Sequence, residues 1–262
     1  MKIVIIIPTY NEKKNISDLI DALEKEFFAF GRSPSVADGF GAYVSGEKNL
    51  PKHQFSILIV DGNSPDGTAE TVVQKKKIYQ NINLTVEKEK RGLGMAYIEG
   101  MNYAIQQLKA DAFIEFDGDG QHDPKDIKRL VAELDNGYDY VIGSRYVAGG
   151  SIPEEWAWHR KFLSRFGSLF IKRLLGLPTN DNTSAFKLSR VKNFAEKLPL
   201  SEDKILSKRH AYKIHLLYEM LALGAKTKEI PIQFLERSGG SSKSSLEDIV
   251  ESLRVAFKLY FR

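Results

Sequence analysis

The chain has 262 residues, enough for one large or two small domains, and its hydrophobic content of 42% is sufficient for a substantial core. Lysine and arginine total 38 against 34 aspartate and glutamate residues, so the net charge of +4 does not by itself indicate a nucleic-acid-binding protein. Cysteine is absent, which excludes disulfides, thiolate nucleophiles and cysteine-based metal centres.

The N-terminal part of the sequence alternates apolar strands with amphipathic helices. Ile3–Ile7 is a continuous β-branched run, typical of a strand covered on both faces, and apolar residues at helical spacing predict a helix over Asn15–Phe28. A second unit comprises a strand over Phe55–Val60 and a helix over Ala69–Tyr79. Residues 30–52, between the two units, are interpreted as a long irregular insertion.

The same alternation continues through the middle of the chain. We predict a strand over Ile82–Val86, a helix over Met95–Leu108, a strand over Ala112–Phe116, a helix over Ile127–Leu134 and a strand over Tyr138–Ile142. Strands that alternate with helices form a mostly parallel sheet. The sequence therefore predicts an α/β fold with helices flanking a central sheet.

Polar clusters follow four of the predicted strands. They are Thr9–Glu12, Asp61, Asp117–Gln121 and Gly143–Tyr146. Because open α/β sheets bind ligands beyond the carboxyl ends of their strands, we expect these clusters to meet at one edge.

The segment Asp117–Gln121 contains two carboxylates two residues apart and an amide. Asp117, Asp119 and Gln121 together form an oxygen-rich site that suits Mg²⁺ or Mn²⁺, which would also bind a diphosphate. The alternative is that the two carboxylates only cap the turn before Pro124. A single histidine such as His122 is more often a structural residue, or one that supports a metal ligand, than a metal ligand itself.

Two other stretches invite interpretation from composition. Arg91-Gly92-Leu93-Gly94 lacks the spacing of a dinucleotide-binding fingerprint or a P-loop. Residues 160–175 and 246–261 combine basic and large apolar residues, as in helices that lie on a membrane surface, although ordinary packing helices remain an alternative. No run of 18 consecutive apolar residues occurs, so we expect any membrane contact to be peripheral.

Several motifs occur in a defined order along the chain. They are Pro8–Glu12, Val60–Thr68, Arg91–Ala96, Gly143–Tyr146, Asp181–Ser184, Glu229–Ile232 and Glu236–Lys243. With these motifs the sequence resembles the dolichol-phosphate (polyprenol-phosphate) mannose synthase family over positions 3 to about 243. The resemblance implies a GT-A fold and an inverting glycosyltransferase that moves a hexose, usually mannose from GDP-mannose, to dolichyl or polyprenyl phosphate.

The resemblance also implies roles for individual residues. Asp117, Asp119 and Gln121 would bind the metal, and Asp119, Arg145 and Arg237 would act in catalysis. Residues expected at the nucleotide sugar are Pro8, Tyr10, Glu12, Asp61, Asp117, Arg237 and Lys243, and those expected at the acceptor phosphate are Ser144, Arg145 and Arg160.

Arginine suits such a phosphate-rich centre because its planar guanidinium matches phosphate oxygens and stays charged. Surface salt bridges are the alternative role for Arg145 and Arg160.

The Gly/Ser-rich segment 237–244 carries Arg237 and Lys243. Composition alone favours a flexible linker, whereas the resemblance implies a lid over the diphosphate. We therefore expect a catalytic domain over residues 1–235, including the insertion 30–52, followed by a lid loop and an amphipathic helix over 236–262.

Three departures from the family pattern bear on the substrate. Gly62 replaces a second acidic residue, Gly118 and Gly120 replace larger residues, and the segment 30–52 is longer than usual. These departures concern recognition of the sugar and the base and not the type of reaction. The chain also lacks the C-terminal membrane helices of some family members, so the basic helices or a membrane-protein partner would bring it to lipid. We expect a cytoplasmic protein, peripherally associated with the cytosolic face of a membrane, that does not bind nucleic acid.

Two rival functions are considered. The first is a transferase of the same fold with a hydroxyl acceptor or a UDP-glucose donor. A hydroxyl acceptor would need a carboxylate base, and Glu219 is the candidate. A regulatory subunit that only binds a nucleotide sugar is the second rival. The presence of Asp117, Asp119 and Arg145 argues against it.

Overall fold

A computed structural model of the chain describes residues 1–29, 52–237 and 246–262. The helices and strands follow in this order: β1 (Lys2–Thr9), α1 (Lys13–Ala29), β2 (Gln54–Asp61), α2 (Thr68–Ile78), β3 (Ile82–Val86), α3 (Leu93–Gln106), β4 (Ala112–Glu115), η1 (Pro124–Asp126), α4 (Ile127–Asp135), β5 (Tyr140–Ser144), α5 (Trp158–Leu175), β6 (Lys187–Arg190), η2 (Ala195–Lys197), α6 (Tyr212–Ala222), β7 (Thr227–Pro231) and α7 (Leu246–Tyr260). The predicted insertion falls outside the described residues except for Lys52, as do residues 238–245 of the predicted lid.

The strands form one seven-stranded sheet in the order β3-β2-β1-β4-β6-β5-β7. All neighbours run parallel except β6, which is antiparallel to both β4 and β5. The predicted mostly parallel sheet is thus confirmed. Because β1, β2, β4 and β5 run in the same direction, the polar clusters that follow them lie at one edge.

The sheet is buried on both faces, as the β-branched run in β1 predicted. Ile3, Ile5 and Ile7 pack with residues of α1, α2 and α4, whereas Val4 and Ile6 pack with residues of α3, α6 and α7. All five side chains are at most 1% exposed. Burying a side chain of this kind stabilises a fold by roughly 1.5–3 kcal/mol, so this strand anchors both helical layers.

The helix α3 lies close against β1 and β2. A Cβ atom added at Gly100 would clash with the Ile6 side chain and lie 3.1 Å from that of Val60. Any larger residue at this position would push α3 away from the sheet, and with it the polar side chains that α3 presents to the carboxyl edge.

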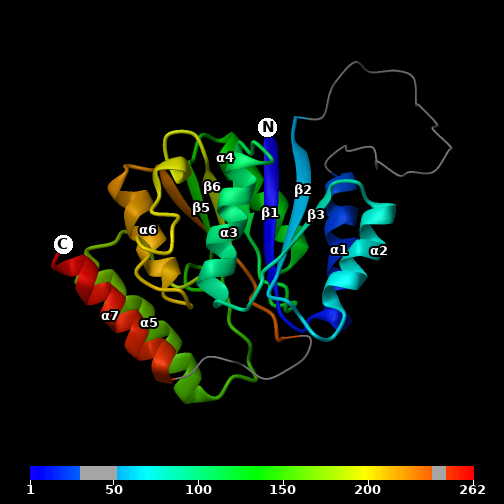
Figure 1. Cartoon of the computed structure of the whole chain (residues 1–262). Helices are drawn as coiled ribbons and strands as arrows, with labels where there is room; N and C mark the ends of the chain where they lie inside the picture. The colour runs from blue at the N-terminus through cyan, green and yellow to red at the C-terminus, as the bar shows by residue number, and fades with distance from the viewer. Residues whose placement is uncertain (30–51, 238–245) are drawn as a thin grey trace.

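Two helices at one end of the molecule pack against each other. In Figure 1, α7 lies beside both α5 and α6, at the end opposite α1 and α2. The rings of Phe170 on α5 and Phe257 on α7 lie 6.3 Å apart. Val255, Ala256 and Leu259 attach α7 to the core of the sheet, so the C-terminal helix packs on the same body as the predicted catalytic domain.

Candidate active site

The acidic segment after β4 meets α3 and the loop that follows β7. Tyr97 of α3 is fully buried and its hydroxyl donates a hydrogen bond of 2.7 Å to Asp117 Oδ1. This bond fixes one carboxylate oxygen of Asp117. Tyr97 was not predicted as a site residue, although it follows directly after the motif Arg91–Ala96, because helical spacing alone does not say which residue of α3 faces the carboxyl edge.

His122 is a supporting residue, as expected for a lone histidine. Its ring stacks on Phe186 at 5.0 Å and meets Phe116 edge-on at 5.4 Å. Burial lowers the pKa of His122 to about 4, so the ring is neutral at pH 7. The neutral Nδ1 accepts a hydrogen bond of 3.3 Å from the Asp117 backbone N–H. His122 therefore shapes the turn that carries the carboxylates.

Asp119, Gln121 and Arg237 form a second cluster beside Asp117. Arg237 Nη2 lies 2.8 Å from Asp119 Oδ2 and 3.4 Å from Gln121 Oε1. Gln121 Nε2 donates to the Leu235 carbonyl at 3.2 Å, which orients the amide oxygen toward Arg237. Two oxygen donors of the predicted metal site thus converge on one cationic nitrogen.

This donor set fits a hard divalent cation. The described residues contain no group of three or more His, Cys, Asp or Glu side chains that could hold a metal ion. The protein could therefore supply two carboxylates and one amide oxygen, and substrate phosphates and water would complete the shell. Mg²⁺ commonly binds in this way, through one or two carboxylates plus phosphate oxygens.

The two carboxylates differ in their electrostatics. Burial and the charge of Asp117 raise the pKa of Asp119 to about 6, against the opposing effect of Arg237. Burial alone would raise the pKa of Asp117 as well, but Lys213 and the Tyr97 hydrogen bond outweigh it and lower that pKa. Two nearby negative charges, one of them on the buried Asp119, favour binding of a cation between them.

The backbone of the acidic segment explains one of the two unusual glycines. Gly120 has φ of 80°, the left-handed region that side chains disfavour, so the turn itself requires glycine there.

Arg145 follows β5 and is held by the segment before β6. Its Nε and Nη2 each donate to a carboxylate oxygen of Asp181 at 2.7 Å, and its backbone N–H donates at 2.9 Å. Nη2 also donates to Thr183 Oγ1 at 2.9 Å. Burial opposes the charge of Arg145, but Asp181 outweighs this effect and the pKa lies above its usual value. The motif Asp181–Ser184 thus orients the arginine.

Arg160 lies near the other two arginines. Its guanidinium carbon is 3.7 Å from the centre of the Trp156 ring, a cation–π contact. Burial and the positive charges of Arg237 and Arg145 lower the pKa of Arg160. The three guanidinium groups therefore share one electrostatic environment, which favours binding of an anion.

The expected nucleotide-binding residues border the ends of β1 and β2. Glu12 adds to the negative potential at Asp119, and the Tyr10 ring lies 3.6 Å from the Lys90 ammonium. Asp61 is fully buried, and its carboxylate accepts hydrogen bonds from Thr9 Oγ1 and from both Ser64 N and Ser64 Oγ. Asp61 therefore holds the loop after β2 together.

Of the remaining predicted residues, Pro8 lies at the end of β1, paired with Val60. Ser144 is fully buried and its hydroxyl accepts a hydrogen bond of 3.3 Å from the Tyr146 backbone N–H. Lys243 lies outside the described residues.

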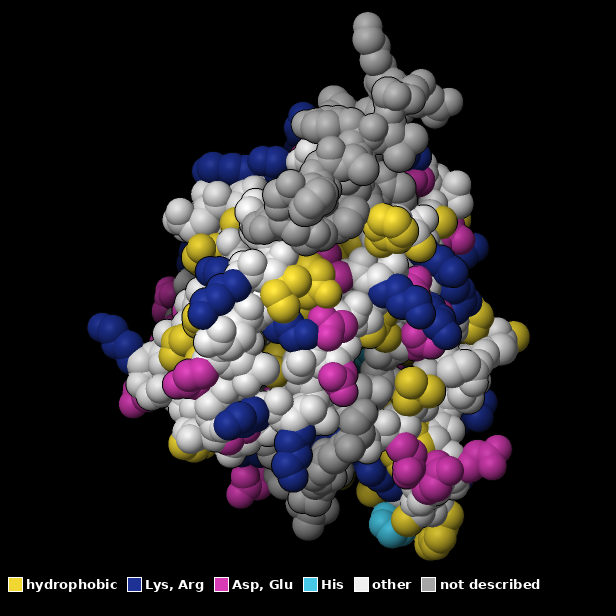
Figure 2. Space-filling view, turned by 90° about the vertical axis from the view of Figure 1, so that its right-hand side faces the viewer, with side chains coloured by type: hydrophobic (Ala, Val, Ile, Leu, Met, Phe, Trp, Pro, Cys, Tyr) yellow, Lys and Arg dark blue, Asp and Glu magenta, His cyan; other side chains and the backbone are white. Residues whose placement is uncertain are grey.

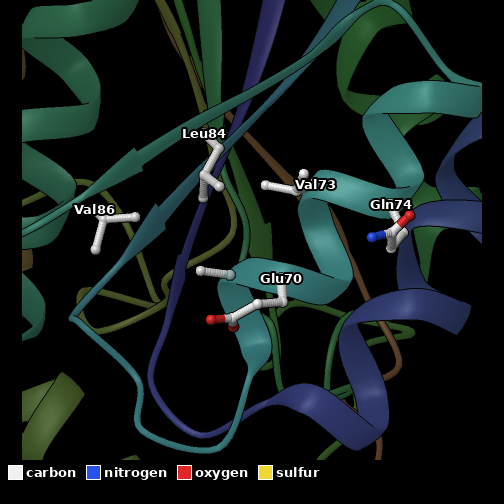
Figure 3. A pocket seen from close by; sticks show the side chains of 6 residues that line it. Glu70, Val73, Gln74, Leu84 and Val86 are labelled. Carbon is white, nitrogen blue, oxygen red and sulfur yellow. The ribbon is translucent and has the colours of Figure 1, made fainter.

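A pocket lies away from these groups. Figure 3 shows a pocket of about 260 Å³ between α2 and β3, lined by Ala69, Glu70, Val73, Gln74, Leu84 and Val86. Its lining is mainly apolar, with one carboxylate and no cationic side chain, so it does not suit a phosphorylated ligand. The candidate active site is the carboxyl edge of the sheet.

Comparison with known proteins adds the family. The model of the family described as "Glycosyl transferase family 2" matches residues 4–197. A polyprenol monophosphomannose synthase of Mycolicibacterium smegmatis is 31% identical over 95% of this chain and 83% of its own length. An undecaprenyl-phosphate mannosyltransferase of Micrococcus luteus is 30% identical over 94% of this chain and 88% of its own length. The expected resemblance is confirmed.

Solved structures agree on the fold. A glucosyl-3-phosphoglycerate synthase of Mycobacterium tuberculosis, solved with Mn²⁺, UDP-glucose and phosphoglyceric acid, superposes with a TM-score of 0.64 at 14% identity, covering 99% of this chain and 80% of that one. The GT-A fold expected from the motifs is thus confirmed. Together with the matched family model and the relatives at 30% identity or more, this places the chain in glycosyl transferase family 2.

Proposed function

We propose that this glycosyltransferase moves mannose from GDP-mannose to a polyprenyl phosphate at a membrane surface. The observation that carries the proposal is the meeting of Asp117 and Asp119 with three arginines at one edge of the sheet. The carboxylates suit a metal-bound donor diphosphate, and Arg145, Arg160 and Arg237 suit phosphates. The names of the curated relatives supply the sugar and the class of acceptor.

The chemistry requires no protein base. A phosphate monoester is largely ionised near pH 7, so one of its oxygens can attack the anomeric carbon directly. The bond from that carbon to the donor phosphate oxygen breaks, the nucleoside diphosphate leaves, and the sugar configuration inverts. Bound Mg²⁺ or Mn²⁺, held by Asp117, Asp119 and Gln121, would offset the charge on the diphosphate. Arg145, already oriented by Asp181, would hold the acceptor phosphate.

The position of Glu219 supports a phosphate acceptor over a hydroxyl acceptor. A hydroxyl would need a carboxylate base, and Glu219 forms an ion pair with Arg262 at the end of the chain. Glu219 lies six residues beyond Lys213, the lysine of α6 whose charge acts on Asp117, which is about 9 Å along the helix axis at 1.5 Å per residue.

The membrane contact is assigned to the paired helices α5 and α7. Large apolar side chains on both are exposed: Trp158, Phe162, Leu163, Phe166, Leu169, Ile249, Val250, Leu253, Phe257 and Tyr260. Basic residues of α5 flank them. The opposite end of the molecule, with α1 and α2, shows charges of both signs with scattered apolar side chains (Figure 2). A basic and apolar surface favours binding to anionic lipid. No helix in the described ranges is both long and apolar enough to span a bilayer.

Vesicle binding checks this surface. Phe162 and Phe166 are 59% and 52% exposed, and replacing both by serine should weaken binding to phosphatidylglycerol vesicles by about tenfold or more. Phe28→Ser on α1 is the matched control, since Phe28 is 62% exposed at the other end. Sedimentation in which the double variant and the control bind equally well would reject the assignment.

A product assay tests the proposed reaction. The purified chain is incubated with Mg²⁺ or Mn²⁺, a panel of labelled GDP- and UDP-sugars, and either polyprenyl phosphate or a matched prenol. We expect a labelled lipid only from GDP-mannose and only with the phosphate. Product on a hydroxyl acceptor, with none on polyprenyl phosphate from any donor, would overturn the acceptor class.

A further inference from the structure

A small polar cavity lies between the end of β5, the segment before β6 and the first turn of α6. Its volume is about 40 Å³, and its polar lining comprises Asp117, His122, Arg145, Thr183, Ser184 and Lys213. A space of this size admits a water molecule or a single oxygen-bearing group and excludes a sugar ring. It therefore suits one end of a larger polar ligand.

Lys213 is the unexplained member of this lining. The residue is 7% exposed, and within the part of the chain that the structure describes its ammonium donates no hydrogen bond and forms no ion pair within 4.0 Å. An ammonium with little solvent contact and no protein acceptor can donate to a bound anion. Asp117 faces Lys213 across the cavity, and the charge of Lys213 lowers the pKa of that carboxyl. The donors themselves remain unused.

Two further donors point to an anion in the same cavity. The bonds of Arg145 to Asp181 and Thr183 use Nε and Nη2, which leaves Nη1 as the third nitrogen of a fixed guanidinium. Thr183 Oγ1 accepts from Arg145, so its own hydrogen is free to donate elsewhere. Ser184 offers nothing more, because its hydroxyl already donates to the Gly143 carbonyl and accepts from the Phe186 N–H.

We propose that Lys213 is a substrate-binding residue whose ammonium donates to a phosphoryl oxygen in the cavity that it shares with Arg145 and Thr183. The proposal rests on the proposed function for the presence of phosphates. Acceptor monophosphate and donor diphosphate carry the same oxygen chemistry, so either one could supply this oxygen. Asp117 also borders the cavity, and the negative charge of its carboxylate disfavours a bound anion. The positive charges of Lys213 and Arg145 offset that effect.

Direct binding measurements separate the two phosphates. Lys213→Gln removes the charge at nearly constant length, and Lys226→Gln removes the charge of an exposed lysine just before β7 as a control. Calorimetry with GDP and with a water-soluble short-chain prenyl phosphate gives two independent affinities. A lost charge-assisted hydrogen bond should weaken one of them by about ten- to a hundredfold.

The two arms identify the source of the oxygen. Weaker binding of the prenyl phosphate alone assigns it to the acceptor, and weaker binding of GDP alone assigns it to the donor. Wild-type affinity of Lys213→Gln for both ligands would overturn the proposal. These measurements need no turnover, so wild-type protein that binds GDP but makes no glycolipid would reject the proposed function and leave the role of Lys213 testable.

A second variant excludes a purely structural role. If Lys213 only balanced the charge of Asp117, Lys213→Arg would retain that role and bind both ligands as the wild type does, which would contradict the proposal. The larger guanidinium would instead fill a phosphoryl site of about 40 Å³, so we expect weaker phosphate binding. This variant also keeps the test decisive if Lys213→Gln does not fold.

Discussion

Arg145 and Arg237 approach the site from two regions of the molecule that hold them differently. Arg145, after β5, has a side chain that is 9% exposed, and it is paired with an Asp181 side chain that has no exposed surface. Arg237, beyond β7, has a side chain that is 25% exposed and contacts Asp119 through Nη2. The first pair is geometrically fixed by two parallel hydrogen bonds, whereas the second depends on one nitrogen.

Folding alone orients Arg145, whereas the proposed metal binding would move Arg237. Arg145 is in place before any substrate arrives, because Asp181 orients its guanidinium. Arg237 lies between the oxygens of Asp119 and Gln121, where the proposed metal ion would bind. Under the proposed function, a divalent cation bound by Asp119 would displace Arg237, which would then be available to the diphosphate. Removing the partner of each arginine, or one arginine itself, tests this comparison.

Asp119→Ala should have the largest effect. It removes the partner of Arg237 and one proposed metal ligand, and we expect turnover to fall by at least about a hundredfold. The melting temperature should not fall, because the buried Asp119 carboxylate is repelled by Asp117. Asp18→Ala, at an exposed position of α1, is the control. Normal turnover in Asp119→Ala would rule out the metal site.

Asp181→Asn should instead act on stability. The change keeps the shape of the side chain but leaves the Arg145 charge buried without a counter-charge, at a cost of about 3–5 kcal/mol. Urea unfolding of the variant and the wild type measures the loss. Arg237→Ala should change the free energy of unfolding by less than about 1 kcal/mol, because its ion pair is partly exposed. Equal losses in the two variants would remove the distinction between the arginines.

Arg237→Ala should have the smallest effect, on metal binding. Without substrate, Asp119 would no longer be shared with a guanidinium, so the protein should bind Mn²⁺ about fivefold more tightly, equivalent to roughly 1 kcal/mol. Titration followed by the electron paramagnetic resonance signal of free Mn²⁺ measures this affinity. If Mn²⁺ bound more weakly to the variant, Arg237 would have to support the cation site rather than compete for it.

The N-terminal half of the fold was predictable because each signal was local. The five-residue run Ile3–Ile7 predicts a buried strand without reference to any neighbour, and β1 covers it. The pair Asp117 and Asp119 stood out for the same reason, since it begins two residues after the end of β4, and the metal site there stays a prediction. Parallel strand direction then placed the polar clusters together, as β1, β2, β4 and β5 confirm.

The C-terminal half carried weaker signals. β6 has only four residues, Lys187–Arg190, with a cation at each end, yet Lys187 is fully buried between β4 and β5. Its ammonium donates to the Lys213 carbonyl, a contact that depends on tertiary structure alone. The segment Tyr212–Ala222 contains Lys213 and His215 among buried residues, so its apolar spacing did not stand out as a helix. Lys213 could not be identified as a site residue before α6 was placed.

The direction of β6 has a consequence for how such an enzyme could change its substrate. Because β6 runs against its neighbours, the segment before it, with Asp181 and Thr183, reaches the same edge as the segments after β1, β2 and β4. The segment before β6 can therefore change what it presents to this edge, provided that Asp181 and the buried Phe186 are kept, while the N-terminal segments keep their geometry. A library confined to that segment would sample new acceptors without redesign of the N-terminal half, where we propose that the nucleotide binds.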